Sequence, residues 1–188
     1  MRLTGIIAPD LPLLVVAADE EATYLGRELP VLLTGIGKVN AAVSVAAVLA
    51  RHTPAEIINL GTAGALRPGI HGTHEVARVI QHDLDGRGIS ALTGRPTGEP
   101  FELRAEGLVL ATGDVFVSAE DVRVKLAADA HLVDMEGYAV AAAAAAAGVP
   151  VRLVKHVSDG ADDDSAKTWK ESVDDCARDL AAWVSTHL

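Results

Sequence analysis

The chain is poor in cysteine, in aromatic residues and in basic residues. Its single cysteine, Cys176, excludes an internal disulfide and a metal site built from cysteines. Lys and Arg number 16 against 26 Asp and Glu, which gives a formal net charge of −10. The basic surface that nucleic-acid binding requires is therefore missing, and we expect no nucleic-acid partner. An acidic chain can still bind small, neutral ligands.

Long apolar runs are also missing. The longest candidate for a membrane span, residues 139–147, is too short and consists mostly of alanine. The N-terminus lacks a basic segment followed by an apolar one, so we expect no signal peptide. We therefore expect no membrane partner. The low cysteine content favours a reducing, cytoplasmic location.

Six short segments rich in apolar residues predict β-strands. Glycine turns at 35–37 and 61–64 follow the second and third of these strands, and a helix is expected over 38–51. This alternation of strand, turn and helix predicts a single α/β domain over residues 1–188, with a largely parallel sheet. The expected strands are residues 13–17, 30–34, 56–60, 74–80, 108–112 and 151–154.

Other segments complete the expected organisation. The acidic residues Asp19 to Glu21 are typical of the first turn of a helix, where carboxylates complement the helix dipole. Residues 85–100 carry four glycines and two prolines, which predicts an irregular loop. Helices are expected over 136–147, which ends in seven alanines, and over 165–188. The apolar positions of the last helix are Trp169, Val173, Cys176, Leu180 and Val184.

The strand at 151–154 delivers a Ser-Asp pair, Ser158 and Asp159, to its carboxyl end. In open α/β sheets, ligands bind at this end of the strands. A carboxyl group that is partly shielded from water can act there as a general acid. The alternative interpretation is that the pair only caps a turn.

Two further carboxylates, Glu21 and Glu136, also lie close to the ends of predicted strands. Any one of these residues alone is more typical of a structural role than of a catalytic one. On a sheet of this type, however, Glu21, Glu136 and Asp159 could line one crevice.

Seven short segments follow one another from the first expected strand to the start of the last helix: residues 17–21, 34–39, 58–64, 82–85, 112–116, 134–137 and 158–162. In this order they resemble the nucleoside phosphorylase and nucleosidase superfamily, and most of all the methylthioadenosine/S-adenosylhomocysteine nucleosidases. The resemblance implies a central mixed sheet flanked by helices, a dimer or larger oligomer, and chemistry without a metal or organic cofactor. The scattered histidines, which lack metal-ligand spacing, agree with the absence of a metal.

The resemblance implies catalytic roles that agree with the chemistry of a glycosidic bond. Asp159 would protonate the free nitrogen in the five-membered ring of a purine, so that the base leaves as a neutral molecule. Ser158 would hold Asp159 in orientation. Glu21 would position or deprotonate the attacking water.

The same resemblance implies the residues that bind the substrate. Glu136 would accept hydrogen bonds from the ribose hydroxyls, and its charge would favour a developing sugar cation. Met135 would pack against the ribose and Phe116 would stack on the purine, although either could instead belong to the core. Val117 would offer backbone groups to the base. The expected contacts also include Thr62, Ala63 and Gly64.

The choice between water and phosphate as the nucleophile depends on cations. Phosphorylases of this superfamily typically carry an arginine immediately before the second glycine turn, where this chain has Asn59. Asn59 and Glu21 together favour water. Arg67, which follows the turn, stays open as a phosphate ligand, and the 35–37 loop could donate N–H groups to an anion.

The chain departs from the family pattern in four places. The segment between Glu21 and Val31 is short, residues 85–100 are irregular, Lys155 stands where an arginine is usual, and Asp134 replaces a glutamate. Lysine cannot clamp a carboxylate in a bidentate manner. These changes affect the identity of the substrate more than the reaction.

The sequence therefore predicts a homodimeric hydrolase of a purine nucleoside. The favoured substrate is an adenine 5′-thionucleoside such as methylthioadenosine, as in methionine salvage. The alternatives are a phosphate-dependent purine nucleoside phosphorylase, a futalosine-type nucleosidase and a catalytically silent nucleoside-binding protein.

Overall fold

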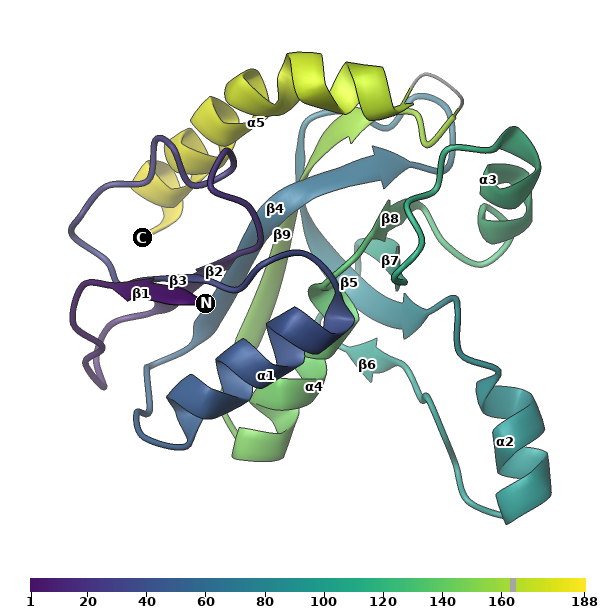
Figure 1. Cartoon of the computed structure of the whole chain (residues 1–188), viewed down its shortest axis with the longest axis horizontal. Coiled ribbons are helices and arrows are strands. Elements are labelled where there is room, and N and C mark those ends of the chain that lie inside the picture. Colours follow the sequence, from purple (N-terminus) through teal and green to yellow (C-terminus); the bar gives the residue numbers. More distant parts are fainter. Residues whose placement is uncertain (163–164) are drawn as a thin grey trace.

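In the computed structural model, which describes residues 1–162 and 165–188, nine strands form one mixed sheet (Figure 1). Among the described residues, no helix is long and apolar enough to cross a membrane. The strands are β1 (Arg2–Thr4), β2 (Leu13–Val16), β3 (Val31–Leu33), β4 (Ile57–Ala65), β5 (Thr73–Gln81), β6 (Phe101–Glu102), β7 (Leu108–Thr112), β8 (Leu132–Asp134) and β9 (Val151–Asp159). The helices are α1 (Lys38–Leu49), α2 (Gly86–Thr93), α3 (Glu120–Leu126), α4 (Gly137–Ala147) and α5 (Ser165–His187).

The sheet curls on itself around β4. One edge of β4 pairs first with β2, in parallel, and near its end with β8, in antiparallel orientation. Its other edge pairs with β9 along nearly its whole length. Because β9 pairs with β5, β5 with β7, and β7 with β8, these five strands close into a small, distorted barrel. This closure brings the ends of β4, β8 and β9 together.

Residues 61–64 continue β4, so the prediction of a glycine turn there was wrong. The physical reason is close packing rather than turning. A Cβ at Gly64 would lie 3.0 Å from both Ala161 Cβ and Asp159 Oδ1, and the register with β9 shifts between Ala63 and Gly64. Glycine here lets the strand approach the segment that follows β9.

Helices pack on the two faces of the sheet. On one face α1 and α4 pack against each other and on β2 and β4, with Val45, Val48, Val140 and Ala144 in their shared core. On the other face α5 covers β4 and β9 through Leu180, with Trp183 partly buried beside it. The predicted α/β fold with a mixed sheet flanked by helices is thus confirmed.

The predicted helix start at Asp19 to Glu21 was wrong, because these residues form isolated turns. The N–H of Ala22 bonds to Asp19 O and that of Thr23 to Glu20 O, each three residues back, and no helix follows. Tyr24 in the same segment donates a hydrogen bond of 2.7 Å to Asp174 on α5. Ala22, Leu25 and Leu29 pack into the core beneath α5, so this turn is anchored to that helix.

Residues 85–100 are not entirely irregular, since they contain α2. Asp85 caps the helix by accepting a hydrogen bond from Gly88 N at 2.9 Å, and Gly94 ends it with a φ of +68°, in the left-handed region. The glycines that predicted a loop therefore begin and end a short helix. α2 stands apart from the rest of the molecule in Figure 1.

The packing of α4 on α1 predicts that a larger side chain at Ala144 destabilises the protein. Ala144 is fully buried, whereas Ala146 on the same helix is exposed. We expect Ala144→Leu to lower the free energy of unfolding by about 1–3 kcal/mol, because it overpacks the interface. Ala146→Leu is the matched control and should change little. Urea unfolding would measure both, and equal midpoints would contradict this account of the interface.

Candidate active site

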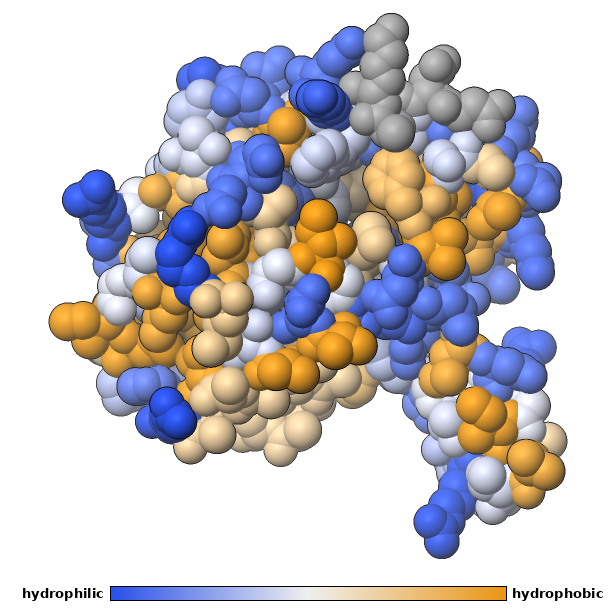
Figure 2. Space-filling view, viewed as in Figure 1, coloured by the Kyte–Doolittle hydropathy of each residue, from blue (hydrophilic) through white to orange (hydrophobic). Residues whose placement is uncertain are grey.

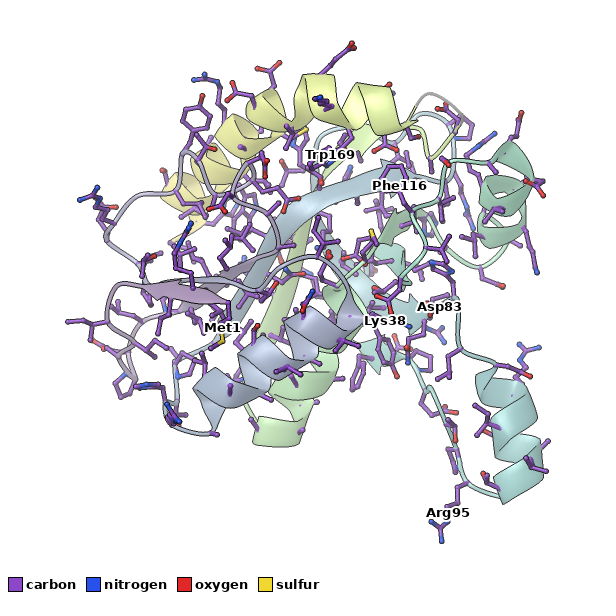
Figure 3. All side chains as sticks on the ribbon, viewed as in Figure 1. Met1, Lys38, Asp83, Arg95, Phe116 and Trp169 are labelled. Atoms are coloured by element: carbon purple, nitrogen blue, oxygen red, sulfur yellow. The ribbon has the colours of Figure 1, made fainter. Side chains whose placement is uncertain are left out.

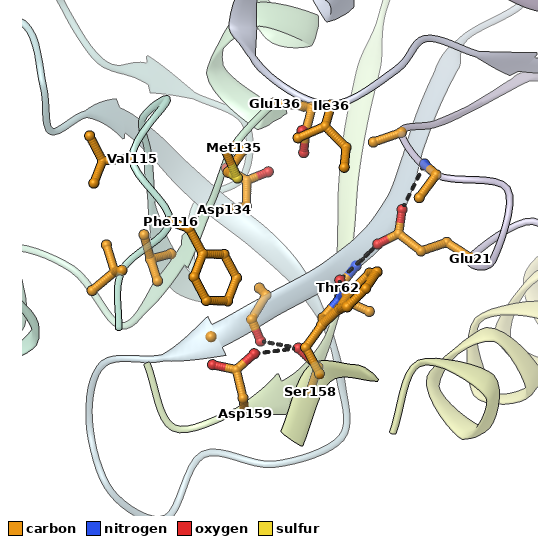
Figure 4. Close-up of a pocket in the computed structure, with 17 residues that line it drawn as sticks. Glu21, Ile36, Thr62, Val115, Phe116, Asp134, Met135, Glu136, Ser158 and Asp159 are labelled. Atoms are coloured by element: carbon orange, nitrogen blue, oxygen red, sulfur yellow. Dashed lines mark hydrogen bonds between the residues drawn. The ribbon is translucent and has the colours of Figure 1, made fainter. Parts of the chain in front are cut away.

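A cavity of about 290 Å³ lies at the joined ends of β4, β8 and β9 (Figure 4). All ten residues that the sequence analysis assigned to catalysis or substrate binding line it, and seven more residues complete the wall. The assigned ten are Glu21, Thr62, Ala63, Gly64, Phe116, Val117, Met135, Glu136, Ser158 and Asp159. The further seven are Ala17, Ala18, Ile36, Val115, Val133, Asp134 and Trp169. The structure thus brings the assigned residues together, while their roles stay predictions.

Glu21 is held at one side of the cavity by donors from two elements. Its Oε1 accepts hydrogen bonds from the backbone N–H and the hydroxyl of Thr62, both at 2.7 Å. Its Oε2 accepts a bond from Ala18 N at 3.2 Å. The side chain is 5% exposed, so three donors fix a nearly buried carboxylate whose Oε2 still has room for another donor.

Asp159 is held at the opposite side by its chain neighbours. Oδ2 accepts a hydrogen bond of 2.7 Å from the Ser158 hydroxyl, and Oδ1 accepts one of 2.9 Å from Ala161 N. Asp159 is half-buried, and Ser158 is buried. These bonds orient the carboxyl group of Asp159 and also shape the turn after β9, while the catalytic role of the Ser-Asp pair stays a prediction.

A buried ion pair underlies the third side of the cavity. Lys155 Nζ lies 2.9 Å from Asp134 Oδ2, and both side chains are 1% exposed. Asp134 also accepts hydrogen bonds from the Thr112 hydroxyl at 2.5 Å and from Gly137 N at 2.8 Å. The single contact from Nζ is the monodentate clamp expected of lysine at this position.

Glu136 lies beside this ion pair, at the start of α4. Its Oε1 accepts a hydrogen bond of 2.7 Å from Gly37 N. Burial, together with the charge of Asp134, raises the pKa of Glu136 to about 7, although Lys155 and the Gly37 N–H favour its ionised form. Burial alone would lower the pKa of the Lys155 ammonium, but Asp134 and Glu136 raise it, so Lys155 stays charged.

The loop that reaches Glu136 is fixed from behind by a polar cluster (Figure 3). Lys38 Nζ pairs with Asp83 and donates a hydrogen bond of 3.1 Å to Gln81 Oε1. Lys38 N donates to Asp114 Oδ1 at 2.7 Å, and Asp114 N donates to Asp83 Oδ2 at 2.8 Å. This cluster ties the beginning of α1 to the segment that carries Phe116.

The remaining wall is apolar. Phe116 and Val115 lie on one side of the cavity, Met135 lies at its back, and Ile36 faces it from the loop before α1 (Figure 4). Val117 also lines the cavity. Phe116 is 44% exposed, which leaves a ring face available to a flat ligand. Trp169 was predicted only as part of the apolar face of α5, and its indole N–H gave no sequence signal for a place in the cavity.

No Lys, Arg or His is among the lining residues within the described part of the chain. Asn59, at the position of the phosphorylase arginine, is buried in the sheet and donates to Val15 O at 3.0 Å. Arg67 is not among the lining residues; its Nε donates to Ala127 O at 2.9 Å, and with Arg123 it lines a neighbouring cavity that shares only Ser158 and Asp159 with this one. Four carboxylates, from Glu21, Asp134, Glu136 and Asp159, thus share a wall without a cation in it.

Comparison of the sequence with known proteins identifies one family. A family model described as the phosphorylase superfamily matches residues 20–88 and 97–187. The chain is 31% identical to the 5′-methylthioadenosine/S-adenosylhomocysteine nucleosidase of Bacillus velezensis, over 82% of this chain and 78% of that protein. It is 29% identical to the nucleosidase of the same name from Marinomonas sp., over 88% of this chain and 82% of that one.

Solved structures share the fold. One is a mutant of the Helicobacter pylori nucleosidase with 5′-methylthioadenosine in its active site; the TM-score is 0.78 and the identity 21%, over 94% of this chain and 97% of that one. Another is a mutant of futalosine hydrolase from Helicobacter pylori, with a TM-score of 0.82 and 21% identity over the same shares. At this level of identity the two structures show a common fold alone.

The raised pKa of Glu136 predicts a pH-dependent contribution to stability. The folded protein retains this proton up to about pH 7, whereas an ordinary carboxyl group loses it near 4.5. The contribution to the free energy of unfolding is therefore complete below pH 4.5 and is lost as the pH rises to about 7, at about 1.4 kcal/mol for each pH unit between the two pKa values. Glu136→Gln should remove this dependence, as measured by urea unfolding across that range.

The quantity to compare is the difference in the free energy of unfolding between the wild type and Glu136→Gln at each pH. Burial lowers the pKa of His82 and of His156, and these groups add stability with rising pH in wild type and variant alike. Their effects cancel in the difference. A difference that does not change between pH 4.5 and 7 would contradict the burial and charge account of Glu136.

Proposed function

The chain belongs to the phosphorylase superfamily, and within it we propose that the protein hydrolyses the N-glycosidic bond of a purine nucleoside with water as the nucleophile. The observation that carries this proposal is the cavity wall, which combines four carboxylates with no cation among the described residues. A phosphate dianion would be repelled by such a wall, whereas a neutral water would be bound and polarised by it.

Asp159 would act as the general acid on the leaving base. Each oxygen of its carboxyl group already accepts one hydrogen bond, from Ser158 or from Ala161, and each has a second lone-pair direction. A protonated Asp159 can therefore keep both bonds and give its proton to the free ring nitrogen of the purine. The base then leaves as a neutral molecule instead of an anion.

Glu136 would stabilise the sugar as positive charge develops on it. Its Oε1 is taken by Gly37 N, and Oε2 has no hydrogen-bond partner among the described residues. That oxygen is therefore free to accept a bond from a ribose hydroxyl, and the ionised group is favourable near a sugar cation. Met135 and Phe116, which line the same cavity, would pack on the sugar and the base.

Glu21 would receive the proton of the attacking water. Its two oxygens are oriented by Thr62 and Ala18, so the carboxylate needs no rearrangement before it acts. The new bond forms between the water oxygen and the anomeric carbon as the bond to the base breaks. The products are the free base and the free sugar.

The substrate that we favour is an adenine 5′-thionucleoside such as methylthioadenosine. Support comes from the curated relatives at about 30% identity, which carry the name 5′-methylthioadenosine/S-adenosylhomocysteine nucleosidase and align with most of this chain. Futalosine and other purine nucleosides belong in the same assay, because a structural likeness at 21% identity does not discriminate between these substrates.

The proposed reaction predicts that the protein releases adenine from methylthioadenosine in phosphate-free buffer. Chromatography would measure this release. Phosphate should neither be required nor yield a ribose 1-phosphate product. Release only in the presence of phosphate would show a phosphorylase, and binding of adenine compounds without turnover would show a silent binding protein. Either outcome would overturn the proposal.

The assignment of the acid predicts that Asp159→Asn lowers kcat by about 10²–10⁴-fold, because the amide cannot supply the proton. Asp10→Asn is the matched control, since Asp10 is exposed and lies outside the cavity lining. Equal rates for Asp159→Asn and wild type would remove Asp159 from its assigned role.

We also infer a homodimer, from apolar side chains that are exposed near the cavity (Figure 2). Val39 and Val43, on one side of α1, are 72% and 63% exposed, and Ile36 and Val115 are exposed beside them at the cavity lining. Such a cluster on a protein surface is typical of an interface. The resemblance of the sequence to an oligomeric family points the same way.

The dimer predicts a molecular mass of twice the chain in light scattering at micromolar concentration. Val39→Arg should shift the protein toward the monomer, because it places a charge in the apolar cluster. Val124→Arg, at an exposed valine on α3, is the control and should leave the mass unchanged. A wild-type protein with the mass of one chain would contradict the inference.

A further inference from the structure

Trp169 connects α5 to the carboxylate that would activate water. Its indole Nε1 donates a hydrogen bond of 2.9 Å to Thr62 Oγ1, and the Thr62 hydroxyl donates one of 2.7 Å to Glu21 Oε1. The three side chains come from α5, from β4 and from the turn after β2, and all three line the cavity (Figures 3 and 4). They form a chain of hydrogen bonds that ends at Glu21.

The chemistry of the indole determines which groups donate and which accept in this series of hydrogen bonds. An indole N–H can donate a hydrogen bond but cannot accept one, so Thr62 Oγ1 must be the acceptor from Trp169. The single proton of the hydroxyl is then available for Glu21 Oε1. Because Thr62 N and Ala18 N also donate to this carboxyl group, all three of its protein contacts require it to be an acceptor. Such contacts fix the orientation of the carboxyl group.

We propose that Trp169 is a positioning residue, which orients the Thr62 hydroxyl as a donor and thereby holds the Glu21 carboxyl group toward the attacking water. The inference rests on the hydrolytic function proposed above. A phenylalanine at this position would fill the same space but could not donate, so the role depends on the indole nitrogen and not on the size of the ring.

The consequence of removing the donor follows from the freedom of a hydroxyl group to rotate. Without Trp169 Nε1, the Thr62 hydroxyl loses one of the contacts that orient it and can turn its proton away from Glu21 Oε1. The ionised carboxyl group then loses a donor. The acid limb of the pH–rate profile would consequently move to higher pH.

Other charged groups face Glu21 and are the same in wild type and variants. Lys155 of β9 is a cation close to Glu21, since a Cβ at Gly61 would lie 3.3 Å from both Lys155 Nζ and Glu21 Oε1. Glu136 at the start of α4 and Cys176 on α5 also interact electrostatically with Glu21. Any pH dependence of kcat that these groups cause is therefore common to the wild type and all the variants compared.

The test is the pH dependence of kcat for adenine release from methylthioadenosine by Trp169→Phe. We expect kcat to fall by about 3–10-fold and the acid limb to move up by about half to one pH unit, as the loss of one hydrogen bond predicts. KM should change little. Trp183→Phe is the matched control, because Trp183 lies on the same helix and outside the cavity lining. Its profile should coincide with that of the wild type.

A double-mutant cycle separates this role from simple packing. Thr62→Val should move the acid limb in the same direction, and Thr62→Ser should restore the wild-type profile because it keeps the hydroxyl. Trp169→Phe combined with Thr62→Val should be no worse than Thr62→Val alone, since the indole acts through the hydroxyl. If Trp169→Phe does not fold, Trp169→Leu provides a second variant without a donor.

Two results would overturn the inference: an acid limb that is unchanged in Trp169→Phe, or effects of the two substitutions that add fully in the double variant. Either can occur in an active enzyme. Failure of the proposed function is distinguishable, because the wild-type protein would then release no adenine at all.

Discussion

The buried ion pair between Lys155 and Asp134 is the contact on which the rest of the cavity depends. Asp134 ends β8, Lys155 lies in β9, and the same aspartate caps the first turn of α4 through Gly137 N. Thr112 at the end of β7 donates to Asp134 and accepts from Tyr138 N. The carboxylate of Asp134 thus joins β7, β8, β9 and α4. These contacts determine the position of Glu136, which directly precedes α4. Such a pair contributes little net stability after desolvation, but it fixes one arrangement, since an unpaired charge there would be costly.

The four carboxylates that line the cavity are held by two kinds of donor, a buried ammonium group and neutral N–H or O–H groups. Lys155 is paired with Asp134 and buried behind the cavity surface, so it offsets negative charge without contacting a ligand. Backbone N–H groups hold the other three carboxylates: Gly37, Thr62, Ala18 and Ala161 each donate to a different carboxyl oxygen. Glu21, Glu136 and Asp159 are therefore oriented by neutral donors.

Much of this site could be predicted from the sequence, because strand ends and short motifs are local features. Ser158 and Asp159 follow a clear apolar strand, and the strand does deliver them to the cavity. Predictions failed where long-range packing decides the local conformation. The sequence predicts Gly61 and Gly64 as turn residues, yet both lie in β4, where a Cβ would be only 3.3 Å from Lys155 Nζ at Gly61 and 3.0 Å from Asp159 and Ala161 at Gly64. Trp169 read as a core residue, because nothing in a helical periodicity shows where an indole nitrogen points.

The short turn that carries Glu21 is anchored to α5, and this has a mechanical consequence. Ala22, Leu25 and Leu29 share a core with Leu180 and Trp183, and Tyr24 bonds to Asp174 across the same boundary. Glu21 and Trp169 are thus attached to the same helix, whereas Thr62, which joins them, lies on β4. A tilt of α5 would therefore move Glu21 and Trp169 together relative to Thr62 and lengthen the hydrogen bonds that connect the three side chains.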